Sequence, residues 1–161
     1  MHIVIIKNNL KRTMNNLRNI KYIVVHCSAT PANTTLEAIK CIWKEQSGRG
    51  DTPAYHFFIE RDGNIIQLLD ENKNSNHIHL HNDDSINIAY LGGIDKSGKP
   101  IDNRSRSQKH AMFDKIVELT ERYPNAEVIG YCDFPNTHKA SPCFDVKEWL
   151  KNYEPDLSNA A

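Results

Sequence analysis

Eight histidines, without an excess of basic over acidic residues, raise the question of a metal site. His26 ends a short run of β-branched and aromatic residues that starts at Lys21, and ligands commonly gather where a strand ends. Three others alternate in the run His77-x-His79-x-His81, and alternating side chains share a face in an extended segment. A solvated loop lining a groove would explain this run equally well. The sequence thus offers two candidate binding groups.

Four cysteines form a second set of reactive side chains, but their spacing gives no metal motif. They are far apart and include no C-x-x-C pair, which argues against a zinc ribbon and against a disulfide-rich secreted scaffold. We therefore expect reduced thiols at Cys27, Cys41, Cys132 and Cys143.

The element that positions His26 can be predicted from hydrophobic periodicity. In residues 21–27 (KYIVVHC), alternation places Tyr22, Val24 and His26 on one face and the intervening residues on the other. This pattern predicts a buried strand that ends at the histidine.

Helices and further strands alternate along the chain. Thr34 and Glu37 form a capping box that opens a helix over residues 35–46, and Ser105 and Gln108 form a second box before another helical stripe. Further strands are predicted at AYHFFIE, NIIQLLD, SINIAYLGG and AEVIGYC. An Asp-Gly turn between the first two predicts a hairpin, and the alternation of strands with helices predicts an α/β fold. Residues 71–84 follow neither period and are expected to form a long loop.

Composition limits the size and partners of the protein. With 161 residues and 39% apolar content, the chain is expected to form one domain over residues 20–153, with an N-terminal extension (1–19, containing the alternative start Met14) and a tail (154–161). Twenty basic residues balance twenty acidic ones, so no global field attracts nucleic acid. No signal peptide or membrane span is recognisable, and we expect a protein that is cytoplasmic as synthesised and acts outside the cell only if released or exported.

Four segments, in their order along the chain, resemble phage amidase lysozymes and peptidoglycan-recognition proteins: YIVVHCSAT, AYHFFIERDGNI, SINIAYLGGIDKSGK and KASPCFDV. The chain is thus similar to the zinc-dependent N-acetylmuramoyl-L-alanine amidases over about residues 21–150. The resemblance implies a central mixed β-sheet flanked by helices and a groove for muropeptide. It also implies hydrolysis of the amide between the lactyl group of N-acetylmuramic acid and L-alanine.

The resemblance also implies roles for individual residues. His26 matches the first zinc ligand, Tyr55 matches the tyrosine that contacts the zinc-bound water or oxyanion, and Lys139 matches the lysine that assists the transition state. His77 matches a substrate-facing histidine. Zinc is therefore the cofactor that the resemblance implies, and peptidoglycan or muropeptide is the partner.

Two of the three zinc-ligand positions of the family carry other residues here. The second position holds Tyr131 and the third holds Ser141. Three protein ligands and an open position lower the pKa of zinc-bound water from about 15.7 to about 7. One imidazole with two neutral hydroxyl groups is a poor ligand set for zinc. We therefore expect zinc binding to be weak or lost.

Two other residues could replace the missing ligands. The loop before KASP is longer than in the phage enzymes and could deliver His138 inward. Cys143 would need a shift of its own loop, and Cys132 should point to the face of its strand opposite Tyr131. These replacements stay open at this point.

Two functions fit these observations. We favour a muropeptide-binding protein with a degenerate zinc site that is weakly active or inactive, because family members that bind without cleaving also carry a serine where Ser141 lies. The alternative is an active zinc-dependent amidase that uses a recruited ligand.

Overall fold

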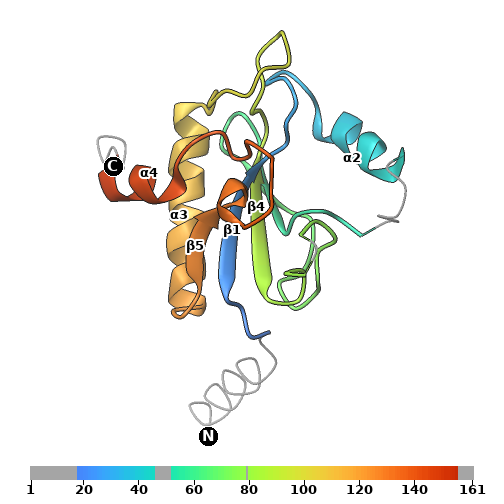
Figure 1. Cartoon of the computed structure of the whole chain (residues 1–161). Helices are drawn as coiled ribbons and strands as arrows, with labels where there is room; N and C mark the ends of the chain where they lie inside the picture. Colours follow the sequence, from blue (N-terminus) through green and yellow to red (C-terminus); the bar gives the residue numbers. More distant parts are fainter. Residues whose placement is uncertain (1–17, 46–51, 79, 156–161) are drawn as a thin grey trace, which may run out of the picture.

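The computed structural model describes residues 18–45, 52–78 and 80–155. They form one sheet with helices on both faces (Figure 1). Along the chain the elements are β1 (Tyr22–Cys27), α2 (Leu36–Glu45), β2 (Phe57–Ile59), β3 (Ile65–Gln67), β4 (Ser85–Tyr90), α3 (Arg106–Arg122), β5 (Glu127–Gly130), the 3-10 turn η1 (Tyr131–Asp133) and α4 (Val146–Asn152). None of the described helices is both long and apolar enough to cross a membrane.

The sheet is mixed, as the resemblance implied. Its five strands are ordered β3-β2-β4-β1-β5. β1 pairs in parallel with β4 and β5, β2 pairs in parallel with β4, and the antiparallel pair β2-β3 is the predicted hairpin. Parallel strands end at the same edge of a sheet, which places the end of β1, with His26, next to the ends of β4 and β5.

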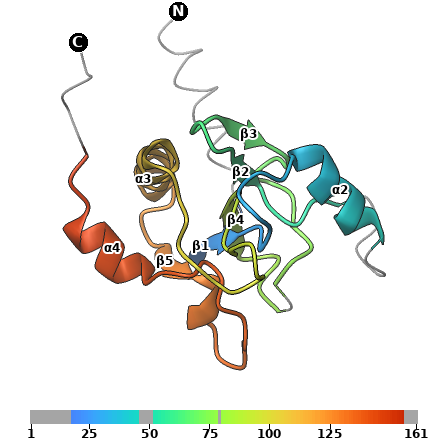
Figure 2. The ribbon, with the colours of Figure 1, turned by 90° about the horizontal axis from the view of Figure 1, so that it is seen from above.

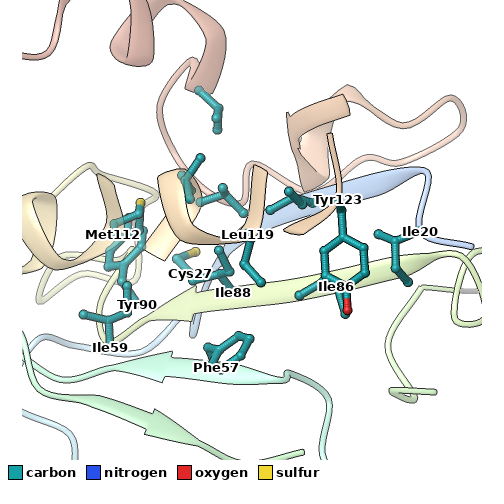
Figure 3. Packing of buried hydrophobic residues seen from close by; sticks show 14 residues of the cluster. Ile20, Cys27, Phe57, Ile59, Ile86, Ile88, Tyr90, Met112, Leu119 and Tyr123 are labelled. Atoms are coloured by element: carbon teal, nitrogen blue, oxygen red, sulfur yellow. The ribbon is translucent and has the colours of Figure 1, made fainter. Parts of the chain in front are cut away.

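The face under α3 and α4 holds the larger apolar core. The predicted capping box of α3 is present. The Ser105 side chain accepts from the Gln108 backbone N–H, and the Gln108 side chain accepts from the Ser105 backbone N–H. Met112 and Leu119 of α3 lie above Ile88 of β4 (Figure 3). All three are fully buried, and burial of such side chains stabilises the fold by about 1.5–3 kcal/mol each.

The opposite face is covered by α2 and by loops. Figure 2 shows α2 across the sheet from α3 and α4. Leu36 and Ile39 of α2 are buried with Tyr55 and Phe58 in a second, smaller cluster. Helix α2 thus forms a wall beside Tyr55.

The start of α2 differs from the sequence prediction. The helix begins at Leu36, and the Ala38 backbone N–H donates to the hydroxyl of Thr35 at 3.2 Å. The capping residue is therefore Thr35, and the box predicted at Thr34 and Glu37 was wrong by one residue. The predicted end at residue 46 lies outside the described residues.

The end of β5 also differs. The strand stops at Gly130, whose backbone N–H donates to the Asp133 carboxylate at 2.8 Å, and the chain turns into η1. Tyr131 therefore does not continue the strand. The prediction that Cys132 alternates with it across the sheet was wrong, because strand alternation ends before both residues, and Cys132 is exposed.

Candidate functional site

His26 is fully buried near the carboxyl end of β1. Its Nε2 lies 2.8 Å from Oδ1 of Asn87, the residue that pairs with Val24 on the neighbouring strand β4. Its Nδ1 is buried and has no hydrogen-bond partner.

A chain of hydrogen bonds fixes which nitrogen of His26 carries the proton. The Ser85 hydroxyl donates to the His81 carbonyl oxygen at 2.5 Å, and its oxygen must therefore accept from Asn87 Nδ2 at 3.2 Å. Asn87 Nδ2 also donates to Ser75 Oγ at 2.8 Å. The amide oxygen of Asn87 is left to accept from His26, so Nε2 holds the hydrogen and Nδ1 holds the lone pair.

Burial keeps His26 neutral. It lowers the pKa of His26 well below its ordinary value of 6.5, and the nearby His77 lowers it further. A neutral imidazole with one nitrogen hydrogen-bonded and the other free is the form in which histidine binds metals or accepts a proton.

Three other rings surround that of His26. The ring centroids of Tyr55, His77 and Tyr131 lie 5.2, 4.8 and 5.1 Å from its own. His77 in turn lies 5.1 Å from Tyr55 and 5.2 Å from Tyr131. The structure thus brings together four residues that the sequence singled out, although they come from four separate segments.

Ser141 and Tyr55 hold the backbone next to His26. The Ser141 hydroxyl oxygen accepts from the Cys27 backbone N–H at 3.0 Å, and the Tyr55 hydroxyl donates to the Cys27 carbonyl oxygen at 3.4 Å. Pro142 packs on Gly130, where an added Cβ would lie 2.8 Å from the Pro142 ring. This close packing holds Ser141 beside the end of β1, past the point where β5 has ended.

A cavity of about 310 Å³ opens above this cluster. Tyr55, His77 and Tyr131 line it together with Lys139 and Ser141, and Trp43 belongs to an apolar wall formed by α2. His26 lies beneath these rings and does not itself line the cavity. The cavity therefore combines apolar surface, hydroxyl groups and one cationic side chain, which suits an amphiphilic anionic ligand.

The two candidate replacement ligands lie elsewhere. His138 is exposed and does not line the cavity. Cys143 lies 3.8 Å from Cys27 between the sulfur atoms and packs against the core under α3. Burial raises the pKa of the Cys143 thiol to about 12, which disfavours the thiolate that zinc requires.

His77 and His81 of the histidine run make different contacts. His77 joins the ring cluster, whereas His81 stacks on Phe134 at 4.8 Å and pairs with Asp84 at 3.1 Å. His79 lies outside the described residues. The described part of this segment forms no strand, as predicted for the loop over residues 71–84, so the alternation of an extended segment does not apply to His77 and His81.

Sequence reasoning missed Asn87. It lies in β4, where every side chain is buried, and it is the group that orients His26. An asparagine between two isoleucines of a buried strand was the available signal, because buried polar groups are almost always hydrogen-bonded.

The residues around His26 do not fit zinc. The free Nδ1 of His26 suits a metal, but the ring of Tyr131 packs against this imidazole and the Ser141 oxygen is engaged by the Cys27 backbone. Among the described residues, no three histidine, cysteine, aspartate or glutamate side chains are grouped to hold one ion.

Comparison with known proteins identifies the family. The sequence profile described as N-acetylmuramoyl-L-alanine amidase matches residues 16–144, and the chain belongs to this family. It is 34% identical over 131 residues to the endolysin of Enterobacteria phage K11, covering 81% of this chain and 85% of that protein. It is also 34% identical over 134 residues to the endolysin of Escherichia phage T7, with 82% and 86% covered.

Solved structures show the same fold. N-acetylmuramoyl-L-alanine amidase LysC of Clostridium intestinale superimposes with a TM-score of 0.68 at 23% identity, covering 84% of this chain and 85% of that one. PGRP-SA of the bumblebee, a peptidoglycan recognition protein, superimposes with a TM-score of 0.62 at 21% identity, covering 84% of this chain and 82% of that one. The fold is therefore shared by proteins named for cleavage and for recognition.

Proposed function

We propose that this protein binds muropeptide in the cavity above His26 and hydrolyses the lactyl–L-alanine amide weakly or not at all. The observation that carries the proposal is the Tyr131 ring, 5.1 Å from that of His26, and the resemblance assigns the second zinc-ligand position to this tyrosine. If Tyr131 and Ser141 stand in place of the second and third ligands, the described residues hold no metal site that would lower the pKa of a bound water.

The binding half of the proposal rests on the cavity. Lys139 offers a cation to the carboxylates of the peptide stem, and Trp43 and Tyr55, with ring centroids 5.4 Å apart, offer apolar surface. His77 and Tyr55 are the residues we assign to substrate contact. Their placement around the cavity supports this assignment.

Metal binding is tested by calorimetry with zinc near neutral pH. We expect weak binding or none, because a single imidazole holds zinc poorly. A sub-micromolar affinity that disappears in His26→Ala would contradict the proposal and support the alternative, an active amidase with a recruited ligand. The free Nδ1 of His26 and the adjacent His77 ring are the observations that favour this alternative.

Recognition is tested by an NMR titration with a muramyl tripeptide in the absence of metal. We expect shifts at His77 and Tyr55, and an affinity reduced about fivefold in Lys139→Met, since a partly exposed charge pair contributes about 1 kcal/mol. Lys147→Met is the matched control, because Lys147 pairs with Glu127 away from the cavity. The absence of shifts at millimolar ligand would overturn the binding assignment.

A further inference from the structure

Residues 68–84 join β3 to β4 without belonging to either, and they carry His77 to the ring cluster. We call this segment, of which the structure describes residues 68–78 and 80–84, the 68–84 loop. A connection of this length needs contacts of its own to keep a single conformation. The start of the described chain passes beside it before β1 (Figure 1).

Arg18 makes the most extensive contacts with this loop. One terminal nitrogen of its guanidinium donates to the carbonyl oxygens of Glu71 and Lys73 at 3.1 and 2.8 Å. The other donates to those of Asn82 and Ser85 at 2.6 and 3.3 Å. One planar cation thus holds both ends of the 68–84 loop.

Asn82 links Arg18 to His77 by hydrogen bonds. Asn82, whose carbonyl oxygen accepts from Arg18, uses its side-chain oxygen to accept from the backbone N–H groups of His77 and Ile78 at 3.0 and 2.9 Å. Ile78 is buried against Val24 and Ile129, which fixes the turn on the sheet. The position of the His77 ring therefore depends on that of Asn82.

We propose that Arg18 is a positioning residue that orders the 68–84 loop and, through Asn82, holds His77 at the cavity for muropeptide binding. This inference rests on the proposed function for its effect on affinity, but the ordering of the loop can be measured without ligand. If removal of Arg18 leaves the loop ordered in about one molecule in ten, the apparent affinity for muropeptide falls about tenfold.

The geometry of arginine matters in this role. A lysine at position 18 would have three donors on a single nitrogen and could not span the carbonyl groups at both ends of the loop. Arg18→Lys should therefore restore only part of what Arg18→Ala loses. Lys21→Ala is the matched control: it removes a cation that pairs with Asp84 at 3.2 Å, but Lys21 is well exposed and such pairs contribute little.

The primary experiment compares amide hydrogen exchange in the full chain and its Arg18→Ala variant. We expect exchange of the His77 and Ile78 amides to become at least about tenfold faster, while the strand amide of Val25 stays protected. Muropeptide affinity, measured by the same NMR titration, should fall about tenfold. Lys21→Ala should change neither.

A second pair of variants tests the link through Asn82 if Arg18→Ala unfolds. Asn82→Leu removes the acceptor for both amides and should reproduce the loss of protection and affinity, whereas Asn82→Asp keeps acceptor oxygens and should preserve both. Unchanged exchange at His77 in both Arg18→Ala and Asn82→Leu would overturn the proposal, as would faster exchange with unchanged affinity. If the unaltered protein binds no muropeptide, the proposed function fails, and the exchange comparison still decides whether Arg18 orders the loop.

Discussion

The two faces of strand β1 bury their side chains in different ways. On one face, Ile23 and Val25 pack within the apolar core beneath α3. On the other, Val24 packs beside His26, whose imidazole is held by a hydrogen bond to Asn87 and enclosed by aromatic rings. Ile23, Val24, Val25 and His26 are all fully buried, and His26 is the polar one among these four side chains.

This difference separates the stability of the fold from its chemistry. Apolar contacts are non-directional, so the α3 face depends on buried area and tolerates small rotations. Hydrogen bonds require set distances and angles, so the His26 face fixes single atoms in place. Tyr131 and Ser141, which the resemblance places at ligand positions of the family, contact the His26 ring and the backbone of Cys27 next to it. Mutations on each face should therefore separate the two properties.

The largest effect is expected from restoring the missing ligands. The double substitution Tyr131→His and Ser141→Cys adds an imidazole and a thiol beside His26, and we expect zinc affinity to rise by at least about a thousandfold, roughly 4 kcal/mol. Each single change should do much less, because zinc needs three protein ligands. Calorimetry of the parent, both single variants and the double variant measures this.

Activity is a separate outcome of the same experiment. Tyr55 and Lys139 line the cavity, so some hydrolysis of purified peptidoglycan is expected once zinc is held. Adding His26→Ala to the double variant should abolish both properties. If the double variant binds zinc no better than the parent, Tyr131 and Ser141 are not the former ligand positions. If it binds tightly but stays inert, those positions are right and the cavity has diverged.

The next largest effect belongs to the apolar face. Leu119→Ala should lower the free energy of unfolding by about 3 kcal/mol, since Leu119 is fully buried and its truncation leaves a cavity. Muropeptide affinity should not change, because the helix packs on the far side of the sheet. Urea denaturation measures the first quantity and NMR titration the second.

Val117→Ala is the matched control on the same helix, because Val117 is 40% exposed. It should cost no more than about 0.5 kcal/mol. If Leu119→Ala is fully folded and still loses muropeptide affinity, the two faces of β1 are coupled, and stability and binding do not separate as argued above.

A smaller effect should appear on acidification. Burial, followed by the proximity of Arg18, lowers the pKa of His56 from 6.5 to about 4. Between these values the unfolded chain takes up a proton that the folded chain excludes, so stability falls as the pH is lowered. From pH 7.5 to 4.5 the loss attributable to His56 is about 2 kcal/mol.

The variant His56→Asn isolates this contribution. An asparagine oxygen can accept from the Asn87 backbone N–H, as His56 Nδ1 does at 3.0 Å, but it does not titrate. Urea denaturation at several pH values should give a shallower loss for the variant. His26, whose pKa is also lowered, should keep part of the dependence in both proteins. If the free energy of unfolding falls equally steeply with pH in both proteins, His56 does not contribute to the acid destabilisation.

Local patterns in the sequence predicted the elements that depend on local interactions. The strand at His26, the β2-β3 hairpin and the capping box at Ser105 were confirmed, since each is specified by residues close together in the chain. The end of β5 was missed, although Asp133, whose carboxylate accepts from the Gly130 backbone N–H, is close in the chain. The packing of Pro142 on Gly130 is a further contact there that the sequence pattern does not show.

The candidate site was only partly accessible for the same reason. The resemblance supplied His26, Tyr55 and His77, which the structure places together, although their roles stay predictions. It could not supply Arg18, whose four carbonyl acceptors lie 53 to 67 residues away along the chain, or the link from Asn87 to His26. Such long-range polar contacts leave no periodic trace.

The smallest effect tests how local the polar network is. Ser75→Ala removes one of the two hydroxyl oxygens that accept from Asn87 Nδ2, and it should lower the free energy of unfolding by about 1 kcal/mol. Ser85 still accepts from the same nitrogen and donates to a carbonyl, so the Asn87 amide cannot turn over. His26 should therefore keep its hydrogen on Nε2, which imidazole nitrogen chemical shifts report directly. Asn87→Leu, by contrast, removes the acceptor for this hydrogen, so His26 should no longer be restricted to the Nε2-protonated form. If Ser75→Ala moves the proton to Nδ1, then both hydroxyl groups are needed to hold His26, and the network is less redundant than its bonds indicate.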